Sequence, residues 1–70
     1  MSTVLGYIEK IIYRNENNGY TVLSVESDDD EYVLVGTFNY IAEGEFIKAN
    51  GNMKLHPSYG EQLFVDEYEI

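Results

Sequence analysis

The sequence predicts an all-β fold, a small barrel of five strands that forms one domain over residues 1–70. Tyr, Val, Ile and Phe come in short runs that clusters of Gly, Asn and Asp interrupt, which is typical of strands and tight turns. The runs lack the helical period. At 70 residues the chain has the length of one small domain, because domains typically have about 50–250 residues.

The first apolar run predicts a long strand with a bend, over residues 3–14. Val4, Gly6 and Ile8 share one face, and the inward positions then change phase to Ile11 and Tyr13. A β-bulge produces such a change of phase, and a glycine eases a sharp bend. We therefore expect a bulged strand that serves both sides of a barrel. Its β-branched and aromatic content argues against a helix.

Turn signals separate the next two strands. Asn18-Gly19 lies between apolar runs and is the strongest short signal for a hairpin, because both residues tolerate positive φ. It predicts a strand over residues 20–26. The acidic residues 28–30 predict a second turn, followed by a strand over residues 31–38. Both strands carry apolar residues on both faces, so the pattern leaves their inner faces open.

The fourth strand shows the clearest alternation. Small residues on its predicted inner face suit the tight waist of a barrel; that face comprises Ile47, Ala49, Gly51, Met53 and Leu55. Before it, residues 39–44 have room for one helical turn. After it, residues 56–60 form a Pro/Gly turn, and the last strand spans residues 62–68. The predicted core is Ile8, Ile11, Val22, Leu23, Val25, Val33, Val35, Ile47, Met53, Leu63 and Val65.

Five strands with one wider connection between the third and the fourth fit a Greek-key barrel, and the OB-fold has that order. An SH3-like barrel is the nearest alternative. A curved sheet completed by another part of a longer protein is the third.

Composition excludes most catalytic and metal chemistry. The chain has no cysteine and a single histidine, so thiol nucleophiles, thiolate metal sites and sites with two imidazoles are ruled out. It has no phosphate-binding GxxxxGK[ST], GxGxxG or GxSxG motif, and we expect no ATP binding, catalysis or cofactor in this chain. The acids at 28–31 do not match a calcium loop. No apolar run is long enough for a membrane span, and we expect a cytoplasmic protein without membrane contact.

Nucleic-acid binding needs aromatic platforms and a basic groove. Seven Tyr and three Phe supply the first, but four Lys and Arg against thirteen Asp and Glu give a net charge of -9. This charge predicts weak binding of single strands, or none, and favours docking on a basic protein surface. If the domain does contact single-stranded DNA, the candidates lie on the outer side of the fourth strand and nearby, with Arg14 close to them: Tyr20, Lys48, Lys54, His56 and Tyr59.

The order of motifs resembles one family. GYIEKIIYRNENNGYTVLSVE, then VGTF, then EGEFIKANGNMKLHPSYGEQLFVDEYE, is similar to the N-terminal OB-like domain of RecD-like helicases. These are RecD/TraA-family enzymes that resemble the exodeoxyribonuclease V alpha subunit and act without RecBC partners. The resemblance runs from about Leu5 to Tyr68.

The resemblance implies a parent protein that is a bacterial superfamily 1 helicase, which uses ATP and Mg²⁺ to move 5′ to 3′ on single-stranded DNA in repair or recombination. No residue here matches its Walker A loop or arginine finger. The chain is then a non-catalytic N-terminal domain of a longer protein. Its expected partners are the rest of that helicase, single-stranded DNA bound through the helicase, and a further protein.

Overall fold

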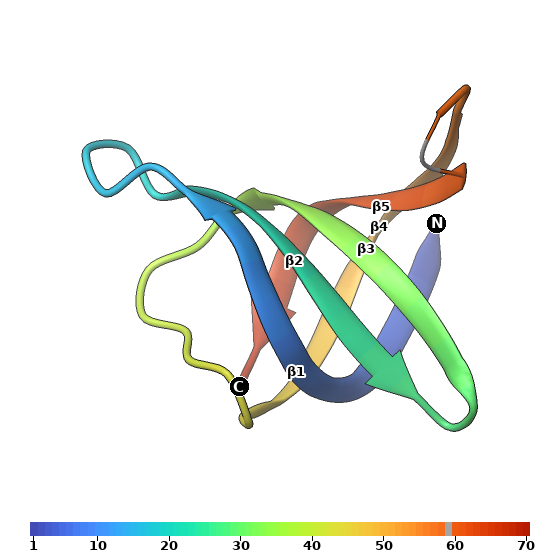
Figure 1. Ribbon diagram of the computed structural model, residues 1–70, viewed down its shortest axis with the longest axis horizontal. Coiled ribbons are helices and arrows are strands. Elements are labelled where there is room, and N and C mark those ends of the chain that lie inside the picture. Colours follow the sequence, from blue (N-terminus) through green and yellow to red (C-terminus); the bar gives the residue numbers. More distant parts are fainter. Residues whose placement is uncertain (59) are drawn as a thin grey trace.

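The computed structural model describes residues 1–58 and 60–70, and the strands form a closed barrel (Figure 1). The strands are β1 (Ser2–Arg14), β2 (Tyr20–Ser27), β3 (Asp30–Thr37), β4 (Phe46–His56) and β5 (Gly60–Glu69). Their spatial order is β1-β2-β3-β5-β4, with β4 paired back to β1. All pairs are antiparallel except β3 with β5. The predicted all-β, five-stranded OB-fold barrel is confirmed.

The bend in β1 lets one strand pair with two neighbours. Its first half pairs with β4, from Ser2 to Tyr7, and its second half pairs with β2. Val4, Gly6 and Ile8 are buried, as predicted. The register against β2 shifts twice, between Ile8 and Lys10 and again between Ile11 and Tyr13. The second shift was not foreseen, and it reverses the predicted position of Tyr13: 51% of this side chain is exposed on the outer face.

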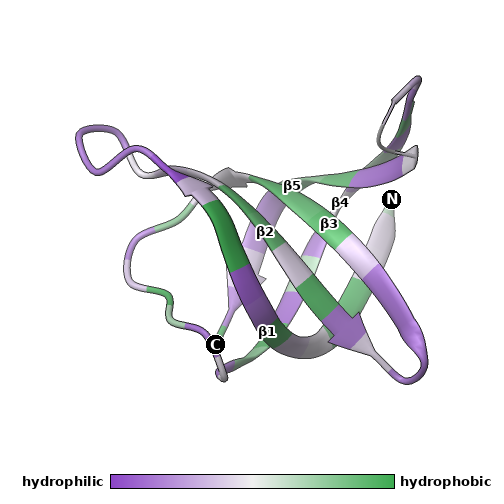
Figure 2. Ribbon diagram, viewed as in Figure 1, coloured by the Kyte–Doolittle hydropathy of each residue, from purple (hydrophilic) through white to green (hydrophobic). Residues whose placement is uncertain are grey.

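The core lies inside the barrel and draws on all five strands. Its buried members are Val4, Ile8, Leu23, Val25, Leu34, Phe38, Ile47, Ala49 and Leu63. Ile11, Met53 and Val65 are half-buried against them, so these predicted core positions are confirmed in part. Figure 2 shows apolar bands along the strands and hydrophilic residues at the Asn15–Gly19 and β2–β3 turns.

Three predicted core residues lie outside this cluster. Val22, Val33 and Val35 line a hollow on the outer face of β2 and β3. Val35 is nevertheless buried, with 6% exposed, so its predicted burial is confirmed, whereas Val22 and Val33 are only half-buried. The inner face of β3, which the sequence pattern left open, is the one that carries Leu34, with Tyr32 packed against the core. The sequence could not distinguish the two faces of β3, because both carry apolar residues. One face packs in the core, and the other lines the apolar hollow outside the barrel.

Leu55 is a wrong assignment, since 78% of it is exposed. It pairs with Glu61 near the end of the β4–β5 ribbon, which extends past the barrel wall (Figure 1). The pattern of β4 continues to this residue, but the core does not.

Residues 38–45 contain no helical turn, contrary to the expectation for residues 39–44. Part of this connection bonds to the bulged stretch of β1. The Ile8 N–H donates to the Glu45 carbonyl at 2.8 Å, and the Gly44 N–H donates to the Ile8 carbonyl at 2.7 Å. The Ile11 N–H donates to a Glu43 carboxylate oxygen at 3.0 Å. These bonds satisfy backbone N–H and C=O groups near the bulges of β1. The connection therefore makes hydrogen bonds to β1 in place of those that a helical turn would make within itself.

Candidate nucleic-acid interface

Two hairpins rise from the same end of the barrel and stand apart from one another (Figure 1). One is the β1–β2 hairpin with its loop Asn15–Gly19. The other is the β4–β5 hairpin, which contains His56 and Pro57. In OB-folds these two loops, together with the face of strands two and three, form the surface that binds oligonucleotides and oligosaccharides. The outer face between the hairpins is therefore the first place to look for a site.

Short-range hydrogen bonds order the Asn15–Gly19 loop. The Asn15 N–H donates to the Tyr20 carbonyl, and the Gly19 N–H donates back to the Asn15 carbonyl, both at 2.8 Å. The side-chain oxygens of Asn15 and Asn18 accept from the N–H groups of Asn17 and Tyr20, both at 2.9 Å. Gly19 has φ of 78°, which glycine adopts without steric cost. Asn18 does not share this conformation, so the predicted hairpin is confirmed with only one of its two residues at positive φ.

Arg14 fastens this loop to the barrel. Its guanidinium donates to Glu16 and to the Thr21 hydroxyl, both at 2.8 Å, and to the carbonyls of Phe38 and Asn39. Its side chain is half-buried, while that of Glu16 is exposed. These donors are thus committed to the fold, and Arg14 acts as a structural residue that joins the end of β1 to the start of the 38–45 connection.

The floor between the hairpins is a row of outward side chains that crosses the sheet. Tyr13 pairs with Val22, Val22 with Val35, and Val35 with Phe64 on β5. Phe64 then lies opposite Asn52 on β4. The groove over this row has a volume of about 600 Å³, and Ile12, Tyr20, Val33, His56 and Gln62 complete its walls. A neighbouring hollow shares Tyr20, Val35 and Phe64 with this groove and is also lined by Asn52, Lys54 and Asp66. We call the two together the hairpin groove.

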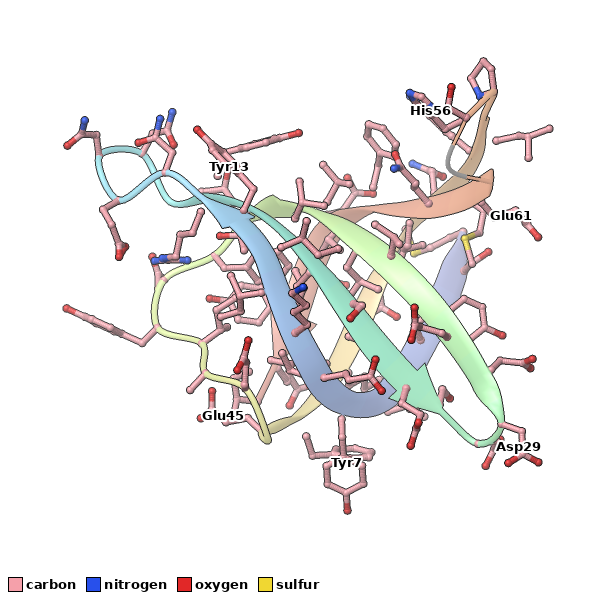
Figure 3. All side chains as sticks on the ribbon, in the orientation of Figure 1. Tyr7, Tyr13, Asp29, Glu45, His56 and Glu61 are labelled. Atoms are coloured by element: carbon pink, nitrogen blue, oxygen red, sulfur yellow. The ribbon has the colours of Figure 1, made fainter. Side chains whose placement is uncertain are left out.

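Aromatic rings and one lysine dominate the groove. The Tyr13 and Tyr20 rings are 6.2 Å apart between centroids, at 59°. The Lys54 Nζ lies 4.8 Å from the centroid of the Phe64 ring, a cation–π contact. Tyr13 and His56 project at the end of the barrel that bears the hairpins (Figure 3). Exposed rings with a cation beside them can stack bases and follow a backbone phosphate, as single-strand binding sites do.

The structure brings together three of the five predicted contact residues. Tyr20, Lys54 and His56 border connected parts of the groove. Lys48 lies at the other end of β4, six residues from Lys54, which is about 20 Å along a strand; it stands opposite Leu5 and Glu69. Tyr59 lies outside the described residues, so its role stays a prediction.

Sequence reasoning missed Tyr13 and Phe64. Phe64 sits between Leu63 and Val65, which were correctly placed inward, so its outward position followed from the same alternation. Tyr13 could not be found in this way, because the second bulge changes its face. The sequence of β2 and β3 did contain a signal for the groove floor. Both strands carry apolar residues on two faces, whereas a strand with one face in water alternates apolar and polar residues.

Acids surround the groove and dominate the rest of the surface. Asp66 lines its edge beside Lys54. Across β1, β2 and β3, a hydrogen bond with Glu31 and the like charge of that carboxylate raise the pKa of Glu9 above its ordinary value, with a smaller contribution from Glu26. Glu26 and Glu31 stand directly opposite each other in the register. The groove therefore offers a nucleic acid aromatic rings and a lysine within a largely acidic surface.

Other classes of site receive no support from the residues described. Within 1–58 and 60–70, no three acidic or histidine side chains gather in a way that could hold a metal ion. No helix in the described part of the chain has the length and apolar character that a membrane crossing requires.

The comparison with known protein families agrees with the fold. No curated protein matches the chain. One protein family does, over residues 1–70, and it is described as the OB-fold domain of the ATP-dependent DNA helicase YrrC. Since the match spans the whole sequence and the barrel has the strand order of an OB-fold, the chain belongs to this family of helicase OB-fold domains.

Proposed function

We propose that the chain is a non-catalytic accessory domain of a RecD-like superfamily 1 helicase, and that it contacts single-stranded DNA through the hairpin groove. The observation that carries the DNA contact is the groove itself: three exposed rings, Tyr13, Tyr20 and Phe64, lie between the two OB-fold loops with Lys54 against one of them. The helicase setting is supported by the family match and by the motif order that resembles RecD-like enzymes.

The proposed division of labour follows from charge. The domain has a net charge of -9, so it supplies few of the phosphate contacts that generate most non-specific affinity. In the proposed parent, a motor elsewhere in the polypeptide binds ATP with Mg²⁺ and holds the strand, in repair or recombination. The OB-fold domain adds stacking contacts that guide the strand. Its isolated affinity is then weak, and its effect appears when the motor keeps DNA close.

Binding of fluorescently labelled oligothymidine to the chain, at low ionic strength, tests the contact. We expect weak binding that Phe64→Ala and Tyr20→Ala each reduce by about 5- to 150-fold, which corresponds to about 1–3 kcal/mol per stacked base. Phe46→Ala is the matched control for the ring variants, because Phe46 is an exposed ring on β4 far from the groove. Lys48→Ala is the matched control for Lys54→Ala, which should weaken binding. Equal losses from the groove variants and from the controls would show that the groove is not the binding surface.

A further inference from the structure

A second apolar surface lies away from the hairpin groove. Leu5 and Tyr7 on β1 and Phe46 on β4 all face outward, with 46%, 60% and 47% of each side chain exposed. We call these three residues the Tyr7 patch. In Figure 3 the Tyr7 side chain projects from the end of the barrel opposite Tyr13 and His56. The patch and the groove therefore occupy opposite ends of the molecule.

The members of the patch are neighbours in the sheet. Tyr7 pairs with Phe46, and their rings make an edge contact at 5.1 Å between centroids and 75° between planes. Leu5 lies diagonally across the same strand pair, since it stands opposite Lys48. Aromatic side chains that are held by neighbours lose little conformational entropy on binding, and they are common anchors at the centres of interfaces.

The rim of the patch selects its partner. Glu26 stands opposite Tyr7 on β2, and Glu69 stands beyond Lys48 on β5. Both carboxylates are exposed, and Glu9 follows on the outer face of β1. A phosphate backbone would meet these three acids, and the single positive charge of Lys48, which lies between Leu5 and Glu69, does not offset them. A second copy of the chain would bring the same acids together, and its net charge of -9 would add to the repulsion. A basic protein surface is the complement.

We propose that the Tyr7 patch docks the domain on the motor portion of the helicase, at a surface with an apolar pocket and a rim of Lys and Arg. This inference rests on the part of the proposed function that makes the chain a domain of a helicase. Leu5, Tyr7 and Phe46 fill the pocket, and Glu26 and Glu69 meet the basic rim. Docking through this end leaves the hairpin groove free at the other end to receive the strand.

The test uses the isotope-labelled chain titrated with the separately expressed ATPase core of the parent helicase. We expect amide shifts that are largest at residues 5–8 and 45–48 in NMR spectra, and saturable binding. Tyr7→Ala and Phe46→Ala should each weaken this binding by about tenfold or more, as loss of an aromatic anchor does. Glu26→Lys removes no apolar contact, but it should also weaken binding to the ATPase core because it reverses a charge on the rim. For the unmodified chain, the affinity for the core should fall as the salt concentration rises. Phe64→Ala, an exposed ring in the groove, is the matched control and should bind normally.

Three results would overturn the docking surface: no binding to the core, binding that Phe64→Ala weakens and Phe46→Ala does not, or a dimer of the chain that Phe46→Ala dissociates in sedimentation experiments. The oligothymidine titration keeps this failure distinct from failure of the DNA contact. Phe46→Ala should leave oligothymidine affinity unchanged, so loss of core binding with intact DNA binding refutes the docking surface alone.

Discussion

Gly51 lies where β4 crosses the backbone of β5, next to the register shift between Asn50 and Gly51. A Cβ at this position would collide with the carbonyl group of Phe64. We expect Gly51→Ala to lower the free energy of unfolding by about 1–3 kcal/mol or more, because backbone atoms must move. The core of such a small domain supplies only about 3–5 kcal/mol, so much of the chain should unfold. Urea denaturation measures this. Asn52→Ala, an exposed neighbour, should change stability by no more than about 0.5 kcal/mol.

The contact of Glu9 with Glu31 raises the pKa of Glu9 and so gives the domain a pH dependence. The raised pKa of Glu9 means that the folded chain binds more protons than the unfolded chain at pH values between the two pKa values. Stability therefore falls as pH rises through this window. Glu31→Gln removes the largest cause, so it should raise the melting temperature at neutral pH. The advantage should shrink as pH falls through the raised pKa of Glu9. An advantage that persists unchanged in acid would contradict this explanation.

At the scale of elements, Arg14 joins the β1–β2 hairpin to the connection between β3 and β4. Arg14→Lys keeps the charge but cannot reach Thr21 and the carbonyls of Phe38 and Asn39 together. We expect a loss of about 1–3 kcal/mol in unfolding free energy, and faster amide exchange at Phe38, whose N–H donates to the Gly19 carbonyl at 2.9 Å.

Glu16→Gln is the control for Arg14. It weakens only the exposed ion pair, which is typically worth about 0–1 kcal/mol. If Glu16→Gln costs as much as Arg14→Lys, the ion pair holds the loop and the contacts to the 38–39 carbonyls contribute little.

The sequence predicted that the five strands exist. It did not predict which face of β3 points inward or on which face the end of β1 places Tyr13. Short β-branched runs and glycine turns predicted five strands close to their observed bounds, because strand propensity and turn chemistry are local. The face of β3 and the position of Tyr13 depend on what packs outside the barrel and on a second bulge, which no local pattern records. For the same reason the sequence predicted Tyr20, Lys54 and His56 as neighbours of a site but also added Lys48, because it treated one face of β4 as one surface.

At the scale of the whole molecule, the two outer surfaces differ in what they can bind. The hairpin groove combines rings with a lysine at one end of the barrel, and the Tyr7 patch combines rings with carboxylates at the other. Closure of the barrel fixes their separation, because β1 and β4 each contribute to both ends. A substitution at one end should therefore leave binding at the other end intact, provided that the barrel remains folded.

The salt dependence of oligothymidine binding distinguishes the groove from a path along β4. Lys54 is the one lysine among the described groove residues, so few phosphates are neutralised. The slope of log K against log salt should be shallow, about -0.7 for each phosphate on a single strand. Lys54→Ala should reduce its magnitude by about 0.7, and Lys48→Ala should leave it unchanged, because Lys48 lies at the far end of the strand. If both variants flatten the slope equally, the strand runs along the whole outer face of β4, as the sequence pattern alone suggested. Fluorescence titrations at several salt concentrations measure these slopes, and stacking on Phe64 and Tyr20 should then carry most of the affinity that remains at high salt.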